Sequence, residues 1–161
     1  MDWKARDWKA RDWNHYRFRS VWELPAPPGA VYAVLERAEE YPRWWPQVRS
    51  VTPLDGSETS GAAVFRSFLP YELHVMACEK RRDPAAGVLE VAMTGDLEGW
   101  ARWTLTLLPG GGTRAVYDQE VEVSKPLMRR FAVAGRPVFL ANHAWMMRGG
   151  RRGLTAYLRP A

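Results

Sequence analysis

Seven short β-like runs, separated by turn signals and followed by one long helical stretch, constrain most strongly how this chain can fold. In the first run, from His15 to Leu24, apolar side chains at even positions alternate with polar ones, as in a strand with one buried face. Six further runs follow at residues 48–54, 62–69, 71–82, 88–94, 99–108 and 113–123. Their close spacing predicts an antiparallel meander and excludes a βαβ repeat.

Turn residues mark the ends of these runs. The segment Pro109-Gly110-Gly111-Gly112 is the clearest hairpin loop, and it separates the last two runs. Asp55-Gly56, Asp83-Pro84 and Gly95-Asp96 supply further turns. Strand, turn and strand therefore follow one another from residue 48 to residue 123.

Two helical segments are predicted between the first and second strands. Prolines end the first strand, and the pair Pro27-Pro28 can open a short helix that carries Val31, Val34 and Leu35. The next segment, 41–46, reads Tyr-Pro-Arg-Trp-Trp-Pro, and its two prolines allow at most one helical turn. We expect this tryptophan pair to close one end of the core.

The last third of the chain predicts a long C-terminal helix. Pro126 opens a helical region that Gly135 and Pro137 interrupt. Beyond Pro137, the residues that recur at helical spacing are Phe139, Asn142, Met146, Gly149 or Gly150, Gly153 and Tyr157. Glycine disfavours a helix by up to about 1 kcal/mol relative to alanine, so glycines gathered on one side predict close packing against a sheet.

The composition is that of one globular domain. The chain has 161 residues and 47% hydrophobic content, and no apolar run approaches the roughly 20 residues that cross a bilayer. The N-terminus lacks the apolar segment of a signal peptide. Cys78 is the one cysteine, so neither a disulfide framework nor a multi-cysteine zinc site is expected. These features predict a cytoplasmic protein without a transmembrane segment.

The net charge of +5 comes mainly from arginine, since 4 of the 23 basic residues are lysine. The basic groups at 80–82, 129–130 and 148–152 are not accompanied by the aromatic stacking motif of a nucleic-acid module. We therefore expect no specific nucleic-acid partner, although arginines could also dock an acidic partner.

A pentapeptide repeat begins the chain. Asp-Trp-Lys-Ala-Arg occurs at residues 2–6, recurs at 7–11 and starts again at Asp12-Trp13. A period of five matches neither helix nor strand. Residues 1–13 are therefore interpreted as a flexible extension that the fold does not need, with a membrane or partner anchor as the other interpretation. The domain itself is expected over 14–161.

This order of elements resembles the helix-grip fold of the START-like (SRPBCC) superfamily, in its polyketide cyclase/dehydrase and lipid-transport branch. The resemblance covers about Asn14 to Leu158, and its most telling segments are 21–27, 31–35, 41–46 and 99–105. It implies an α+β domain in β-α-α-β6-α order, whose curved seven-stranded antiparallel sheet wraps a long C-terminal helix. It also implies an apolar cavity between the sheet and that helix.

The alternation assigns a wide inner face to the sheet independently of the resemblance. The inward apolar residues of the later strands are Leu73, Val75, Ala77, Leu89, Val91, Met93, Trp103, Leu105, Leu107, Tyr117, Val121 and Val123. A small polar set shares this face: Ser20, Ser67, Tyr71, Tyr117, Gln119 and Asn142. Because buried polar groups need hydrogen-bond partners, this set predicts either a water network or ligand recognition.

Candidate catalytic groups are few. His74 and Cys78 fall in the outward register of their strand, and Glu120 and Glu122 share the outer face of theirs. His143 adjoins the inward stripe of the C-terminal helix. If the protein were a cyclase, Tyr117 or Tyr71 could donate to a substrate carbonyl and His143 could accept a proton. No nucleotide or metal motif occurs, and no cofactor is expected.

The leading hypothesis is that the protein binds a hydrophobic small molecule, such as a lipid, a polyketide or an aromatic metabolite. A polyketide cyclase/dehydrase-like enzyme and an interaction module for an acidic partner are the alternatives. The predicted ligand-binding residues are Phe18, Ser20, Trp22, Trp45, Phe65, Ser67, Leu73, Val91, Met93, Trp103, Tyr117, Gln119, Phe139, Asn142 and Met146. Tyr117 and Asn142 are expected to face one another across the cavity.

Overall fold

A computed structural model describes residues 15–54, 56–67, 71–124, 126 and 135–160. The elements are β1 (His15–Leu24), α2 (Pro28–Leu35), η1 (Ala38–Arg43), β2 (Val48–Pro53), β3 (Ser60–Arg66), β4 (Glu72–Asp83), β5 (Val88–Gly95), β6 (Leu97–Leu107), β7 (Thr113–Val123) and α4 (Gly135–Leu158). The predicted extension at 1–13 lies outside the described residues, as do residues 127–134 of the predicted helical region. The predicted α+β class and element order are confirmed, with η1 as a single short 3-10 helix.

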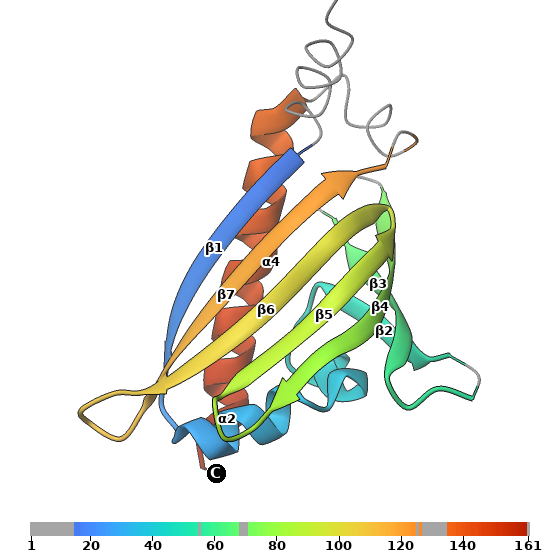
Figure 1. Ribbon diagram of the computed structural model, residues 1–161. Helices are drawn as coiled ribbons and strands as arrows, with labels where there is room; N and C mark the ends of the chain where they lie inside the picture. The colour runs from blue at the N-terminus through green and yellow to red at the C-terminus, as the bar shows by residue number, and fades with distance from the viewer. Residues whose placement is uncertain (1–14, 55, 68–70, 125, 127–134, 161) are drawn as a thin grey trace, which may run out of the picture.

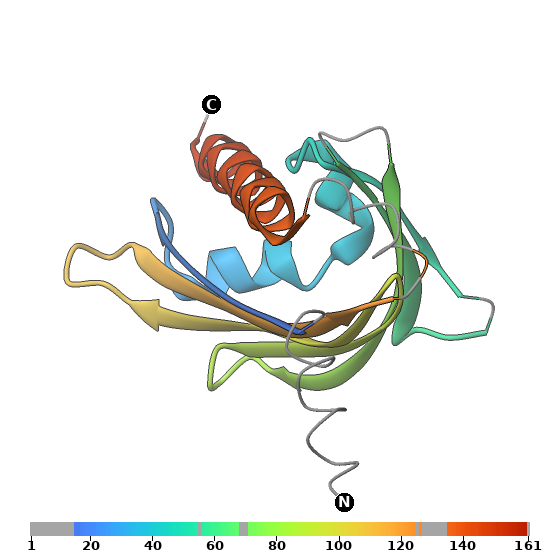
Figure 2. The same ribbon diagram turned by 90° about the horizontal axis from the view of Figure 1, so that it is seen from above.

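The seven strands form one antiparallel sheet in the order β1-β7-β6-β5-β4-β3-β2 (Figure 1). Strands β2 to β7 follow one another as a meander, and β1 pairs with β7 from His15↔Glu122 to Leu24↔Thr113. The first strand of the chain therefore completes the sheet beside the last one. The sheet curves, and α2, η1 and α4 all lie on its concave side (Figure 2).

The core lies between this concave face and the helices, in two clusters. One cluster gathers Trp22, Trp103, Trp45 and Leu154 beneath the C-terminal half of α4. The other gathers Tyr16, Leu73, Val121 and Phe139 near the start of that helix. Phe65 and Tyr117 pack against both clusters, so they stand between the two parts of the core.

The predicted inner face is confirmed with one exception. Leu73, Val75 and Trp103 are all less than 9% exposed, as the alternation requires. Leu107 was predicted to face inward but is 68% exposed. It pairs with Thr113 at the last position of the β6–β7 hairpin, which projects beyond the helices in Figure 1, so nothing covers its side chain. Alternation predicts the face of the sheet to which a side chain points, but it does not predict how far the helices extend over that face.

The glycines of α4 are the closest contact between the helix and the rest of the domain. A Cβ on Gly153 would overlap the carbonyl oxygen of Trp44, and a Cβ on Gly150 would lie 2.6 Å from the Trp45 ring. Gly149 lies against Gln47 in the same way. The close packing predicted for these glycines is confirmed, but the partner is mainly the segment after η1 and not the sheet.

Gly153→Ala is predicted to destabilise the domain severely. Alanine would gain up to about 1 kcal/mol in helix propensity, but the overlap with the Trp44 backbone must move α4 and should cost about 3 kcal/mol net. Chemical denaturation measures this change. Gly29→Ala is the matched control in α2, because a Cβ there meets nothing within 4 Å. It should leave stability unchanged or raise it by up to about 1 kcal/mol.

Candidate functional site

A cavity of about 460 Å³ lies between the concave face of the sheet and the helical segment formed by α2 and η1. The predicted place of the cavity is between the sheet and the C-terminal helix. Among the described residues, however, none of α4 borders the cavity. The reason is that Trp22, Trp45 and Trp103 fill the space beneath α4, with ring centroids 5.7 Å apart for Trp22–Trp45 and 4.8 Å apart for Trp22–Trp103.

The wall of the cavity is apolar and comes from six of the seven strands. Side chains from β2 to β7 line it, and Leu35 and Tyr41 close it from the helical side. The apolar wall residues on the strands are Val48, Val51, Ala63, Phe65, Val75, Ala77, Leu89, Val91, Met93, Ala101, Trp103 and Tyr117. A space of this volume with an apolar wall is typical of small-molecule sites, which span roughly 300–1,000 Å³.

Charged residues border one part of the cavity, and an irregularity in β4 brings one of them, Arg82, to the border. Glu79 pairs with Val91 and Arg81 with Glu90, so Lys80 is an extra residue in β4. This β-bulge shifts the alternation by one position. Arg82, which now pairs with Leu89, consequently shares the inner side with Glu79, and both border the cavity.

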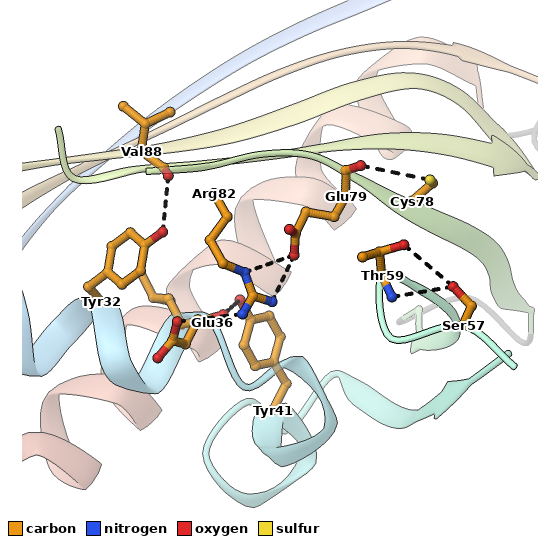
Figure 3. Close-up of polar contacts among 10 residues, drawn as sticks. Tyr32, Glu36, Tyr41, Ser57, Thr59, Cys78, Glu79, Arg82 and Val88 are labelled. Carbon is orange, nitrogen blue, oxygen red and sulfur yellow. Dashed lines mark hydrogen bonds and ion pairs between the residues drawn. The ribbon is translucent and has the colours of Figure 1, made fainter. Parts of the chain in front are cut away.

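Arg82 links β4 to α2 across this part of the cavity (Figure 3). Its Nε donates to Glu79 Oε2 at 3.0 Å, its Nη2 lies 2.7 Å from the same oxygen, and its Nη1 lies 3.8 Å from Glu36 Oε2. The hydrogen bond to Glu79 is the main cause that raises the pKa of Arg82. Nearby, Tyr32 Oη donates to the Val88 carbonyl at 3.3 Å and also joins α2 to the sheet.

The border carries more carboxylates than guanidinium groups. Arg82 is paired with Glu79 and Glu36, and Arg37 lies 3.6 Å from Glu40. Two further exposed carboxylates, Glu39 in η1 and Glu58 before β3, border the cavity without a cation partner among the described residues. The opening is therefore negative although the chain as a whole is positive.

Tyr117 supplies a polar group to the apolar wall. Its ring packs on Trp103 with centroids 4.8 Å apart, and its hydroxyl forms no hydrogen bond within the described part of the chain. Burial raises the pKa of Tyr117, so the phenol stays protonated at neutral pH. It can donate a hydrogen bond but is a poor base. Tyr41, whose pKa burial also raises, donates to the Leu35 carbonyl at 2.7 Å.

A second polar group beside the cavity is His143 on α4, which contacts Gln119 on β7. His143 Nε2 is 3.1 Å from Gln119 Oε1, and the His143 ring stacks on Phe18 at 3.6 Å. Because an amide oxygen accepts only, Nε2 must carry the proton of the neutral imidazole. Gln119 in turn contacts Met93 Sδ at 3.5 Å. Desolvation lowers the pKa of His143 to about 4, so the ring is neutral at pH 7.

Asn142 is separated from the cavity wall. It is 1% exposed, its Oδ1 accepts from Ser67 Oγ at 3.2 Å, and its Nδ2 lies 3.6 Å from Met146 Sδ. The expectation that Tyr117 and Asn142 face one another across the cavity is therefore not met, because Asn142 is used to hold α4 to the end of β3. A buried amide with protein partners on both atoms is explained without a ligand.

The fifteen predicted ligand-binding residues fall into two groups. Six border the cavity: Trp45, Phe65, Val91, Met93, Trp103 and Tyr117. Nine lie elsewhere in or beside the core: Phe18, Ser20, Trp22, Ser67, Leu73, Gln119, Phe139, Asn142 and Met146. Of the catalytic candidates, Tyr117 borders the cavity, whereas Tyr71 and His143 do not. A role in ligand binding or catalysis stays a prediction for all of them.

The outward placement of the remaining chemical groups is confirmed. The His74 side chain is 66% exposed, and Cys78 is an exposed thiol. Glu120 lies 2.8 Å from His15 Nε2 and 3.1 Å from Arg17 Nη2 on the outer face. Within the described residues, no three His, Cys, Asp or Glu side chains gather as metal ligands would.

The residues of the charged border and of the helical side of the cavity were not among the predicted site residues. Glu79 continues the inward register of Leu73, Val75 and Ala77, so its position could have been found by extending that pattern. Arg82 could not, because the bulge at Lys80 has no signal in the residue types. Leu35 and Tyr41 border the cavity because of how α2 and η1 fold over the sheet.

The sequence and the fold both match known proteins. Residues 24–144 match the family described as polyketide cyclase / dehydrase and lipid transport. The chain belongs to this family. The predicted START-like membership is thereby confirmed, and the match covers more than half of the chain. The comparison with curated proteins gives no match.

Solved structures of family-like proteins share the fold at low sequence identity. TTHA0849 from Thermus thermophilus is 18% identical, with a TM-score of 0.67 over 89% of this chain and 100% of that one. The ZhuI aromatase/cyclase from Streptomyces sp. R1128 is 13% identical, with a TM-score of 0.66 over 90% and 96%. A START superfamily protein from Mycobacterium smegmatis is 16% identical, with a TM-score of 0.59 over 84% and 96%.

Helices long and apolar enough to span a membrane are absent from the described residues. The longest described helix, α4, carries several arginines along its second half.

His143 is predicted to make the domain sensitive to mild acid. The pKa is about 4 in the folded protein and 6.5 when solvated. Between these values the unfolded chain binds more protons, so stability falls as pH decreases from 6.5 to 4, by up to about 3 kcal/mol. The glutamine of His143→Gln cannot titrate, so on acidification this variant should lose less of its free energy of unfolding than the unmodified protein, by that amount. Urea denaturation at pH 7 and pH 4 measures the difference.

The control for this prediction is His74→Gln, which makes the same substitution at an exposed histidine. It should lose as much stability on acidification as the unmodified protein. Equal acid sensitivity of the unmodified protein and His143→Gln would mean that His143 does not act as the buried neutral group.

Proposed function

We propose that the protein binds a neutral, largely apolar small molecule in the cavity between the sheet and the α2–η1 segment. The observation that carries this proposal is the cavity of about 460 Å³, whose wall comes from β2 to β7 and is apolar apart from the Tyr117 hydroxyl, Thr59, Ser60 and the charged border. A packed core would fill such a space. The family, which includes lipid transport in its description, supports the same interpretation. The proposal includes the cytoplasmic location that the sequence predicts.

The polar groups of the site favour a particular kind of ligand. The Tyr117 hydroxyl has no partner among the described residues, so it suits a ligand with a hydrogen-bond acceptor such as a carbonyl. Glu39 and Glu58 at the border are not neutralised by nearby described cations, so a ligand anion would be repelled. Together these groups favour a neutral lipid, polyketide or aromatic metabolite over a free fatty acid.

Filling the cavity is predicted to abolish binding. The probe is N-phenyl-1-naphthylamine, a neutral apolar fluorophore that brightens when it leaves water. Ala77 borders the cavity on β4, so Ala77→Phe should occupy its space and weaken binding by about tenfold or more. Ala92→Phe is the matched control, because Ala92 pairs with Cys78 on the outward register of β5. It should change affinity by less than about twofold.

The charge of the border is tested in the same assay with 8-anilino-1-naphthalenesulfonate, which adds a sulfonate to nearly the same apolar body. We expect it to bind several-fold more weakly than the neutral probe, and the difference should shrink at high salt. No saturable binding of the neutral probe, or equal binding by Ala77→Phe and Ala92→Phe, would contradict the cavity as the site. Tighter binding of the sulfonate would contradict the preference for neutral ligands.

A polyketide cyclase/dehydrase-like activity is the second candidate, and the Tyr117 hydroxyl is the observation that favours it. As a protonated phenol bordering the cavity, it could donate to a substrate carbonyl while negative charge develops on that oxygen during an aldol step. His143 supports this interpretation less well, because it lies outside the cavity border and its lowered pKa makes it a weak base.

Tyr117→Phe separates the two candidates. It removes one oxygen and keeps the ring on Trp103, so affinity for the neutral probe should stay within about twofold. An enzyme would in addition cyclise a linear polyketide precursor, and Tyr117→Phe would slow this turnover by about tenfold or more. Product analysis by mass spectrometry measures it. Absence of turnover in the unmodified protein, or turnover unaffected by the change, would contradict the catalytic role of Tyr117.

A further inference from the structure

The arginines of the domain differ sharply in whether they have acidic partners. Those with a carboxylate within 4.0 Å are Arg17, Arg19, Arg37, Arg43, Arg49, Arg81, Arg82, Arg102 and Arg114. Arg148, Arg151, Arg152 and Arg159 have no ion-pair partner among the described residues, and all four are exposed. Elsewhere in the described chain, the exposed basic residues without an ion-pair partner are Arg66 and Lys80. Among the residues that the structure describes, unpaired positive charge is thus concentrated in the second half of α4 and directly after it.

These four residues, the basic patch, lie on the solvent side of α4. At about 100° per residue, Arg148, Arg151 and Arg152 fall within an arc of about 100° on the helix, and Arg159 follows directly after its last residue. The buried residues Met146, Gly150 and Leu154 are on the opposite side. The patch extends for about 16 Å along the helix axis. In Figure 2 this helix lies on the concave side of the sheet.

Stabilisation of the α4 helix does not explain most of the basic patch. Cations stabilise the C-terminal end of a helix, which accounts for Arg159 directly after α4, but Arg148, Arg151 and Arg152 lie one to two turns before the last turn, which has no basic residue. Arg148 repels Arg151 and Arg152 at i+3 and i+4 spacing, and α4 contains no acidic residue that would relieve this. The domain therefore keeps an arrangement that slightly disfavours its own helix.

The chemistry of the basic patch favours carboxylates on another protein. All four side chains are arginine, whose planar guanidinium binds carboxylates in a bidentate manner. A membrane-binding face would interleave large exposed apolar residues with the cations. The nearest such residues are Leu140, two turns earlier, and Tyr157, which points away and contacts Glu40. A straight helix face without exposed stacking rings is also unlike a single-strand nucleic-acid site.

We propose that the basic patch on α4 is a docking surface for the acidic face of a helix in a partner protein. Acidic side chains spaced at i, i+3 and i+4 on the partner would meet Arg148, Arg151 and Arg152, and a further carboxylate would meet Arg159. This surface is separate from the cavity, because no described residue of α4 borders the cavity. The interaction is electrostatic, so it weakens as salt is added.

The test uses the full chain and a fluorescent helical peptide of about 20 residues with glutamates along one face. Its control is a peptide of the same composition with the glutamates scattered around the helix. Binding is measured by fluorescence anisotropy at low salt and at about 150 mM salt. The variant Arg148→Gln/Arg151→Gln/Arg152→Gln should weaken binding of the patterned peptide by about tenfold. Its melting temperature should not fall, because the substitutions remove repulsion, and its binding of the cavity probe should be unchanged.

The matched control variant is Arg17→Gln/Arg49→Gln/Arg114→Gln, which removes the same charge from paired arginines outside α4. It should weaken peptide binding by less than about twofold. Equal weakening by the two triple variants would overturn the proposal, because attraction would then follow net charge alone. Equal affinity for the patterned and scattered peptides would overturn it as well. Tighter binding to phosphatidylglycerol vesicles or to a short duplex DNA than to the patterned peptide would assign the patch to a lipid or nucleic-acid partner instead.

Discussion

The contact between α4 and the Trp44–Gln47 segment holds the two sides of this domain together. Three glycines of α4 leave no side chain between the helix and the backbone of Trp44, the ring of Trp45 and the amide of Gln47. Trp45 strengthens the contact by donating from Nε1 to the Met146 carbonyl at 2.8 Å. Since this segment joins η1 to β2, fixing it to α4 also fixes where η1 covers the sheet. The cavity depends on that position.

The cavity exists because the helices cover the concave face unevenly. Tryptophan and other large side chains fill the half beneath α4, where Trp22, Trp103 and Phe139 are less than 9% exposed. On the other half, β3 to β5 present smaller residues such as Ala63 and Ala77, and the α2–η1 segment spans them without filling the space. Arg82, Glu79 and Glu36 then join the sheet to α2 at the border. Shape and charge at this site thus come from different parts of the chain.

Much of the fold could be predicted from local pattern, but the site could be predicted only in part. Alternation assigned Trp103, Tyr117 and Met93 to the inner face, and all three border the cavity. The same alternation placed Phe18, Gln119 and Leu73 there, yet these lie in the filled part of the core. A packed wall and an open wall use the same residue types, so the pattern could not separate them. His143 shows the same limit, because it lies on α4 and its partner Gln119 comes from β7.

The sequence by itself determined the α+β class and the order of the elements. It also determined which side chains of nearly every strand point inward and which side of α4 carries the glycines. Each of these follows from the spacing of residues along one segment. Tertiary structure decided that the glycines meet Trp44 to Gln47, that the bulge at Lys80 brings Arg82 to the cavity border, and that Leu107 is left uncovered. It also decided which arginines are paired, since the acidic partners of Arg17 and Arg49 are on other strands. These outcomes depend on distances between segments far apart in the chain, which no local pattern encodes.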